Sequence, residues 1–250
     1  MTLGVPGEGR AVDGVLFDVD DTLVDTHGAF AQALAAVSRE WLPGLDPERD
    51  GEVLDHWRAD AEGRYRRYTR GEATYREQRM GRANDLHAVF GGPVLDDEAY
   101  DRWNALFEER FTGAWAAHAD AAGVVRRLLD AGIKVGALTN AATEYQVRKL
   151  TRAGLAADVP LLVGVDTLGF GKPDPRVFAE ACRRLGTSPG RTAYVGDELD
   201  VDARAAAAAG LRGVWLARPG LVAKHANAAQ ALPTDVVIGS LDELPGVLGL

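Results

Sequence analysis

The chain has little cysteine, little lysine and no long apolar run. Its single cysteine, Cys182, cannot form a disulfide within the chain, and a zinc site built on several thiolates is excluded. No stretch approaches the roughly 18 uninterrupted apolar residues that a membrane-spanning helix needs. The glycine-rich segment 1–13 lacks the apolar run of a signal peptide. We therefore expect a cytoplasmic protein with no membrane partner and a flexible N-terminal tail at 1–13.

Lysine is confined to four positions, and all other basic residues except histidine are arginine. Any chemistry that needs an ammonium group must therefore use Lys134, Lys149, Lys172 or Lys224. The formal net charge of -9 disfavours a nucleic-acid polymer as partner. A hydrophobic share of 46% and a charged share of 26% are typical of a globular protein of 250 residues.

The order of apolar patterns predicts an α/β protein with an inserted helical domain. A short apolar strand at 14–18 is followed by helical periodicity from about 27 to 118, without a convincing strand. Strands then alternate with helices, which predicts a Rossmann-like parallel sheet with right-handed crossovers. We place the α/β core at 14–26 and 117–250 and the all-helical domain at 27–116. The further strands are expected at 133–138, 161–165, 193–195, 214–216 and 236–238, and helices of the core at 143–153, 175–185 and 202–209.

Three carboxylates, Asp18, Asp20 and Asp21, follow the first strand within four residues. Carboxylates at this density raise each other's pKa unless a cation neutralises them, and Mg²⁺ prefers such oxygen ligands. The simpler alternative is that these residues only cap a following helix.

Other polar groups follow the later strands. Because ligands bind beyond the carboxyl ends of parallel strands, these groups are expected to meet at one edge of the sheet. Each also has a purely structural explanation, as a helix cap, a rigid turn or a tight turn. Together they supply most of what phosphoryl transfer requires: Thr139 and Asn140, Lys172 in a Lys-Pro-Asp-Pro run, and Asp197 with Asp202.

The order of these motifs resembles the haloacid dehalogenase (HAD) superfamily of phosphohydrolases. The resemblance rests on Asp18-x-Asp20-x-Thr22, Thr139-Asn140, Lys172-Pro173-Asp174-Pro175, and Gly196-Asp197 with Asp202. The helical insertion at 27–116 lies where that superfamily carries its type-1 (C1) cap. The resemblance implies a Mg²⁺-dependent phosphatase of a small phosphorylated metabolite, with a cap that closes to exclude water.

The resemblance also implies a role for each motif residue. Asp18 is the nucleophile that forms an aspartyl-phosphate, and Asp20 is the general acid and base. Mg²⁺ is bound by Asp18, the main-chain carbonyl of Asp20, and Asp197. Asp202 either binds the ion or hydrogen-bonds the groups that do. The phosphoryl group contacts Thr139, the Asn140 N–H and Lys172.

Some positions depart from the family pattern, and some alternatives stay open. Asp21, Glu198 and Val201 stand where many members have glycine, serine and asparagine. A phosphosugar mutase and a non-catalytic binding protein share the same core, and a signalling receiver domain fits the length poorly. Nucleotides, sugar phosphates and phosphoglycolate-like compounds are all candidate substrates, and the protein is expected to be a monomer or homodimer.

Arginines are dense in the helical segment between residues 64 and 82, where aromatic residues are interleaved with them. One interpretation is a solvated helix face beside an aromatic core. The other is that one or two of them bind an anionic substrate. The set comprises Arg64, Arg66, Arg67, Arg70, Arg76, Arg79 and Arg82.

Overall fold

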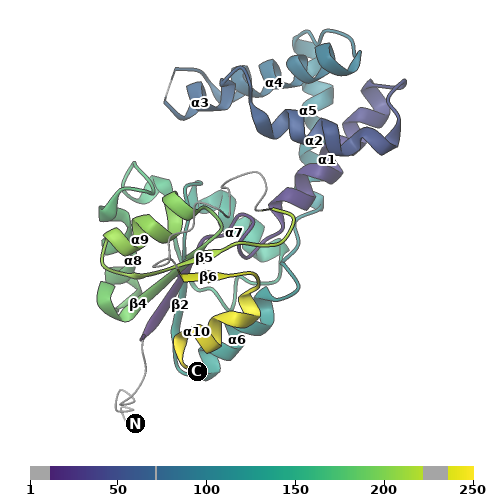
Figure 1. Cartoon of the computed structure of the whole chain (residues 1–250). Coiled ribbons are helices and arrows are strands. Elements are labelled where there is room, and N and C mark those ends of the chain that lie inside the picture. The colour runs from purple at the N-terminus through teal and green to yellow at the C-terminus, as the bar shows by residue number, and fades with distance from the viewer. Residues whose placement is uncertain (1–11, 71, 222–235) are drawn as a thin grey trace. The chain divides into compact units, whose positions relative to one another are not determined.

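The computed structural model describes residues 12–70, 72–221 and 236–250 (Figure 1). The expected tail at 1–13 lies almost entirely outside them. The described residues form two compact units. One contains the chain up to Asp25 and from Ala116 onward, and the other is Thr26–Trp115. That these units act as a catalytic core and a cap stays a prediction.

Among the described residues, six strands form one sheet in the order β3-β2-β1-β4-β5-β6, and every pairing is parallel. The predicted α/β fold with a parallel sheet is confirmed. Chain order reverses on the two sides of β1, which creates a topological switch point between β1 and β4. The strands are β1 (Gly14–Phe17), β2 (Lys134–Leu138), β3 (Leu161–Val163), β4 (Thr192–Gly196), β5 (Arg212–Leu216) and β6 (Val236–Ile238).

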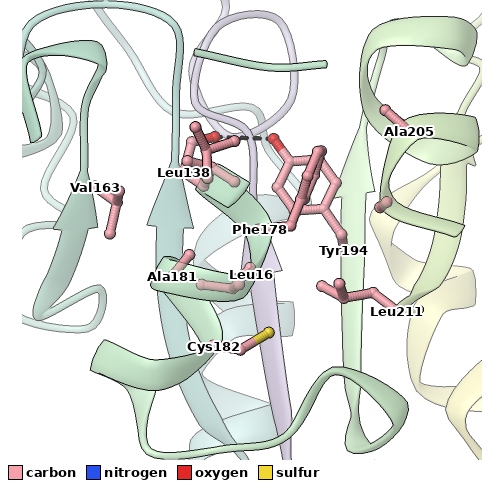
Figure 2. Packing of buried hydrophobic residues seen from close by; sticks show 11 residues of the cluster. Leu16, Leu138, Val163, Phe178, Ala181, Cys182, Tyr194, Ala205 and Leu211 are labelled. Atoms are coloured by element: carbon pink, nitrogen blue, oxygen red, sulfur yellow. Dashed lines mark hydrogen bonds between the residues drawn. The ribbon is translucent and has the colours of Figure 1, made fainter. Parts of the chain in front are cut away.

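Helices cover both faces of the sheet, as right-handed crossovers require (Figure 1). The apolar face of α8 packs through Phe178 and Cys182 on Leu16, Leu138 and Tyr194 of the strands (Figure 2). This buried cluster fixes the strand ends beside it. The helices of this unit are α6 (Ala121–Asp130), α7 (Thr143–Arg152), α8 (Pro175–Leu185), α9 (Ala205–Ala208) and α10 (Leu244–Leu248).

Two expected elements differ from those observed. The strand predicted at 161–165 ends at Val163, and Val165–Thr167 forms a 3₁₀ turn because the Asp166 carboxylate accepts hydrogen bonds from the Thr143 N–H and hydroxyl. The helix predicted at 202–209 begins earlier, as a π-helical segment at Leu199–Arg204 that continues into α9. The Asp202 carboxylate accepts a hydrogen bond from the Glu198 N–H at 3.0 Å, within this wider turn.

The helical unit is built around stacked aromatic rings. The Trp57 and Trp103 rings lie 5.9 Å apart, and Phe107 stacks on Trp103 at 5.3 Å. A capping box between Thr74 and Glu77 begins the helix at Tyr75–Phe90. Among the described residues, no helix combines the length and apolar character needed to cross a bilayer. The helices are α1 (Thr26–Trp41), α2 (Asp50–Ala59), α3 (Arg64–Thr69), α4 (Tyr75–Phe90) and α5 (Asp97–Gly113), with a 3₁₀ turn at Pro47–Arg49.

A largely buried carboxylate, that of Asp120, ties three segments of the α/β unit together. Asp120 receives two hydrogen bonds from the Arg218 guanidinium, both at 2.9 Å. It also accepts from the Ser240 hydroxyl at 2.8 Å and the Leu241 N–H at 2.9 Å. Burial alone would raise the pKa of Asp120, but these donors lower it to about 2. The folded state therefore favours the ionised form.

The Asp120→Ala variant should lose on the order of 3 kcal/mol of unfolding free energy, because it removes the carboxylate partner of the Arg218 guanidinium, whose side chain is only 12% exposed. Since the folded pKa lies below the ordinary value of 3.8, wild-type stability should fall as the pH drops from about 4 to 2. Denaturant unfolding against pH measures both effects. Asp158→Ala is the control, because its partner Arg126 is 66% exposed, and it should cost under about 1 kcal/mol. Equal losses in the two variants would contradict this account.

Candidate active site

The sheet register brings the predicted site residues to one edge. Phe17 of β1 is in register with Ala137 of β2 and with Val195 of β4. The next residues along these strands therefore lie beside each other, and the Asp18 N–H donates to the Val195 carbonyl at 2.8 Å. The polar side chains that follow the strands are largely buried there, namely those of Asp18, Thr139, Lys172 and Asp202, with Asp197 partly buried.

Lys172 is the centre of this cluster, because all three protons of its ammonium group have an acceptor. They point to Asp18 Oδ1 at 2.8 Å, Asp202 Oδ1 at 2.6 Å and the Tyr194 hydroxyl at 2.7 Å. The Tyr194 hydroxyl donates in turn to the Leu138 carbonyl at 2.8 Å (Figure 2). Burial alone would lower the pKa of Lys172, but these neighbours raise it well above its ordinary value. The ammonium group is therefore a permanent positive charge beside Asp18.

The Asn140 side chain holds the Lys172 backbone in place. Asn140 Oδ1 accepts from the Lys172 N–H at 2.6 Å, and Asn140 Nδ2 donates to the Lys172 carbonyl at 2.9 Å. Gly171 makes this approach possible, because a Cβ atom there would lie 2.2 Å from Asn140 Oδ1. Asn140 thus positions the lysine through its side chain, while its predicted phosphate contact uses the main-chain N–H.

Three carboxylates converge next to this lysine. Oxygen atoms of Asp18, Asp197 and Asp202 lie within 4.8 Å of one another. Burial, together with the neighbouring carboxylates, raises the pKa of Asp18 to about 7 even though Lys172 opposes the shift. Burial, together with the nearby Asp18 and Asp202 carboxylates, raises the pKa of Asp197 to about 9. An all-oxygen set with excess negative charge fits a hard divalent cation such as Mg²⁺.

Asp202 differs from the other two carboxylates, because both of its oxygens already accept hydrogen bonds. Oδ1 faces Lys172, and Oδ2 accepts from the Glu198 N–H. A Cβ atom on Gly196 would lie 2.2 Å from Asp202 Oδ2, so glycine is needed at that strand end. Of the two roles predicted for Asp202, these contacts favour the one in which it orients the neighbouring groups.

Asp20 is held by two residues, Lys149 and Gln146, that belong to none of the sequence motifs. Its Oδ1 pairs with the Lys149 ammonium group, and its Oδ2 accepts from Gln146 Nε2 at 2.6 Å. Gln146 Nε2 also donates to the Thr139 hydroxyl at 3.2 Å. The scarcity of lysine was the one sequence signal that could have drawn attention to Lys149. Asp21 has a backbone φ of 58°, which explains why many family members have glycine there.

Two structural alternatives are wrong and one holds. The helix α7 begins at Thr143 with Ala142 at its N-cap, so Thr139 and Asn140 do not cap it. Helix α1 begins only at Thr26, well past the three clustered aspartates. The Lys-Pro-Asp-Pro run does start a helix, since the Asp174 carboxylate caps α8 and Pro175 opens it.

Four of the seven clustered arginines pair with carboxylates inside the helical unit. This favours a structural role for these four and leaves the interpretation of the others open. Arg64 pairs with Asp85, Arg76 with Asp97 and Asp101, Arg79 with Glu108 at 3.2 Å, and Arg82 with Asp60 at 3.7 Å.

A parallel α/β sheet with converging aspartates and a buried lysine at its carboxyl edge defines a doubly wound enzyme-like fold with an acidic site. The family model for haloacid dehalogenase-like hydrolases matches residues 12–210. The chain therefore belongs to the haloacid dehalogenase-like hydrolase family, which confirms the predicted family and the hydrolase class.

Relatives and solved structures extend this comparison. A glyceraldehyde 3-phosphate phosphatase of Methanopyrus kandleri is 29% identical over 83% of this chain and 84% of its own length. A ribulose-1,5-bisphosphate 5-phosphatase of Halopiger xanaduensis is 30% identical over 80% and 82%. The HAD hydrolase YfnB of Bacillus subtilis, solved bound to magnesium, has a TM-score of 0.74 at 23% identity over 96% and 100%. The L-2-haloacid dehalogenase PA0810 has a TM-score of 0.70 at 27% identity over 95% and 99%.

The Gly171→Ala variant should displace the Asn140 amide from the Lys172 backbone, since the added methyl group cannot fit at 2.2 Å. Loss of the two hydrogen bonds should cost on the order of 2 kcal/mol in denaturant unfolding. Gly190→Ala is the matched control, because a Cβ atom at Gly190 meets nothing within 4 Å. A Gly171→Ala protein as stable as this control would show that the Asn140 contact does not hold the loop.

Proposed function

We propose that the protein is a Mg²⁺-dependent phosphatase that hydrolyses a small phosphorylated metabolite through an aspartyl-phosphate intermediate. The observation that carries the proposal is the pairing of each of two aspartates with its own buried lysine, Asp18 with Lys172 and Asp20 with Lys149. This arrangement supplies a nucleophile and a separate proton carrier two residues apart. The phosphatase names of the two curated relatives support the same substrate class.

In this mechanism an Asp18 oxygen attacks phosphorus while the ester P–O bond breaks. The leaving alcohol oxygen takes a proton from the Asp20 carboxyl group. Water then attacks the aspartyl-phosphate and gives a proton to Asp20, which releases phosphate and restores Asp18. The Lys172 charge beside Asp18 favours the ionised nucleophile and stabilises negative charge on the phosphoryl group.

Thr139 is suited to contact the phosphoryl group. Its hydroxyl oxygen accepts from the Ala141 N–H and from Gln146 Nε2, both at 3.2 Å. A hydroxyl that accepts twice still has its own proton to donate, and a phosphoryl oxygen is a strong acceptor. Together with the main-chain N–H of Asn140, this would orient the phosphate.

The acidic side of the site would hold the metal ion. Asp18, the main-chain carbonyl of Asp20, and Asp197 would be its protein ligands, while Asp202 keeps Lys172 in place. The bound ion would neutralise charge that builds up on the phosphoryl oxygens. The close approach of the Asp18, Asp197 and Asp202 oxygens, within 4.8 Å of one another, supports such a role, because a cation there would offset the repulsion between these carboxylates.

The alternative within the family is dehalogenation, since one similar solved structure is an L-2-haloacid dehalogenase. A halide leaves without a proton, so that reaction gives no task to a general acid. The presence of the Asp20 carboxyl group two residues after Asp18 therefore favours an oxygen leaving group, as in a phosphate monoester. Among the described residues, no contact favours a mutase or a non-catalytic binding protein over hydrolysis.

The purified protein should release phosphate from at least one member of a panel of nucleotides, sugar phosphates and small phosphorylated acids. Release should require Mg²⁺ and stop with a chelator. A colorimetric phosphate assay with and without Mg²⁺ measures this, and 2-haloacids with halide detection form the comparison arm. The proposal is refuted if no monoester, including 4-nitrophenyl phosphate, releases phosphate. It is also refuted if the protein releases halide but no phosphate.

The Asp18→Asn variant should lose turnover by about 10³-fold or more, because the amide is a poor nucleophile. Its melting temperature should stay near or above that of the wild type, since a buried carboxylate with a raised pKa is removed. Asp158→Asn, at a half-exposed pair of the same unit, should keep full activity. Retained activity in the Asp18→Asn protein would refute the nucleophile assignment.

A further inference from the structure

Helix α7 buries an unusual set of side chains. Its three buried residues are Gln146, Lys149 and Leu150, so two of the three are polar. The Gln146 side chain is fully buried, and the Lys149 side chain is only 2% exposed. Buried positions on a helix are normally apolar, and lysine is almost never buried unless it is paired. Packing alone does not explain this choice of residues.

Both polar side chains reach the same carboxyl group. Lys149 donates to Asp20 Oδ1, and Gln146 donates to Asp20 Oδ2 at 2.6 Å. Each carboxyl oxygen thus has its own donor, which fixes both the position and the plane of the group. The Asp20 side chain remains 36% exposed, so part of it faces solvent, where a leaving group can approach.

Stability is a weak reason for keeping this arrangement. Replacing a buried ion pair by apolar residues of similar size is often neutral or stabilising. A fixed proton carrier has a clear catalytic value, because a misplacement of about 1 Å can cost about 100-fold in rate. Gln146 also contacts the Thr139 hydroxyl, so one amide group links the proton carrier to the predicted phosphate contact.

We propose that Lys149 and Gln146 are positioning residues that hold the Asp20 carboxyl group where it exchanges protons with the leaving oxygen. The proposal rests on the phosphatase function proposed above. It gives the second buried lysine of the site a task separate from that of Lys172, which contacts Asp18. It also predicts that removing the Lys149 ammonium group lowers kcat/KM most for substrates whose leaving group needs a proton.

The test compares kcat/KM for two esters in the full-length protein with Mg²⁺. One is the best alkyl phosphate from the panel, whose leaving group needs a proton, and the other is 4-nitrophenyl phosphate, whose leaving group does not. Lys149→Met keeps the side-chain length and removes the donor. It should lower kcat/KM about 10- to 100-fold more for the alkyl ester than for the aryl ester. Gln146→Met should act in the same direction with a smaller effect.

Two further variants separate positioning from a general loss of structure. In a protein that already carries Asp20→Ala, adding Lys149→Met should lower kcat/KM for the alkyl ester by a further factor of less than about three, because the effect of Lys149 passes through Asp20. Lys134→Met is the matched control, since the Lys134 side chain is exposed, donates to the Gly186 carbonyl at 2.7 Å, and lies at the start of β2, at the opposite end of the strand from the site. It should leave the ratio of the two kcat/KM values unchanged.

Equal losses for both esters, no loss for either, or full additivity with Asp20→Ala would overturn the proposal. If Lys149→Met does not fold, Gln146→Met alone decides, and an unchanged ratio in that variant overturns the proposal. A wild-type protein that hydrolyses neither ester refutes the proposed function and this inference with it. A wild-type protein that hydrolyses both, with variants that keep its ratio, refutes only the positioning role.

Discussion

The buried ammonium group of Lys172 is the interaction on which the site depends. Taking a charged amine out of water is costly unless acceptors replace its hydration. Here three acceptors do so, and they come from the end of β1, from β4 and from the π-helical segment after β4. The three hydrogen bonds of Lys172 therefore fix the positions of these three elements relative to one another. In return they fix its charge beside Asp18, where the proposed chemistry needs it.

This arrangement is possible because backbone geometry prepares it. Parallel strands in register end at the same height, so Asp18 and the residues after β2 and β4 meet without long loops. Two glycines allow the close approaches that follow, Gly171 next to Asn140 and Gly196 next to Asp202. A side chain at either position would displace a group that contacts Lys172. The site therefore depends on the absence of a side chain at Gly171 and Gly196 as well as on the side chains that are present.

Much of the fold and part of the site could be predicted from the sequence. Apolar periodicity predicts the strands, and the rule that ligands bind at strand ends selects Asp18, Thr139, Lys172 and Asp197. The π-helical segment was missed because it depends on how Asp202 is held by distant partners. Lys149 and Gln146 were missed because polar residues on a helix are normally assumed to face solvent. Their partner Asp20 lies more than a hundred residues away, so local pattern carries no sign of it.

The two aspartates of the first motif illustrate how one short segment can provide two different environments for the two proposed roles. Asp18 is buried between Lys172 and other carboxylates, an environment that suits a nucleophile kept beside positive charge. Asp20 is part-exposed and held from the side by α7, an environment that suits a group exchanging protons with substrate and water. Two of the four lysines in the chain contact these aspartates, Lys172 contacting Asp18 and Lys149 contacting Asp20. Because identical carboxyl groups differ only through their surroundings, the separation of roles depends on the helices behind the strand as much as on the motif itself.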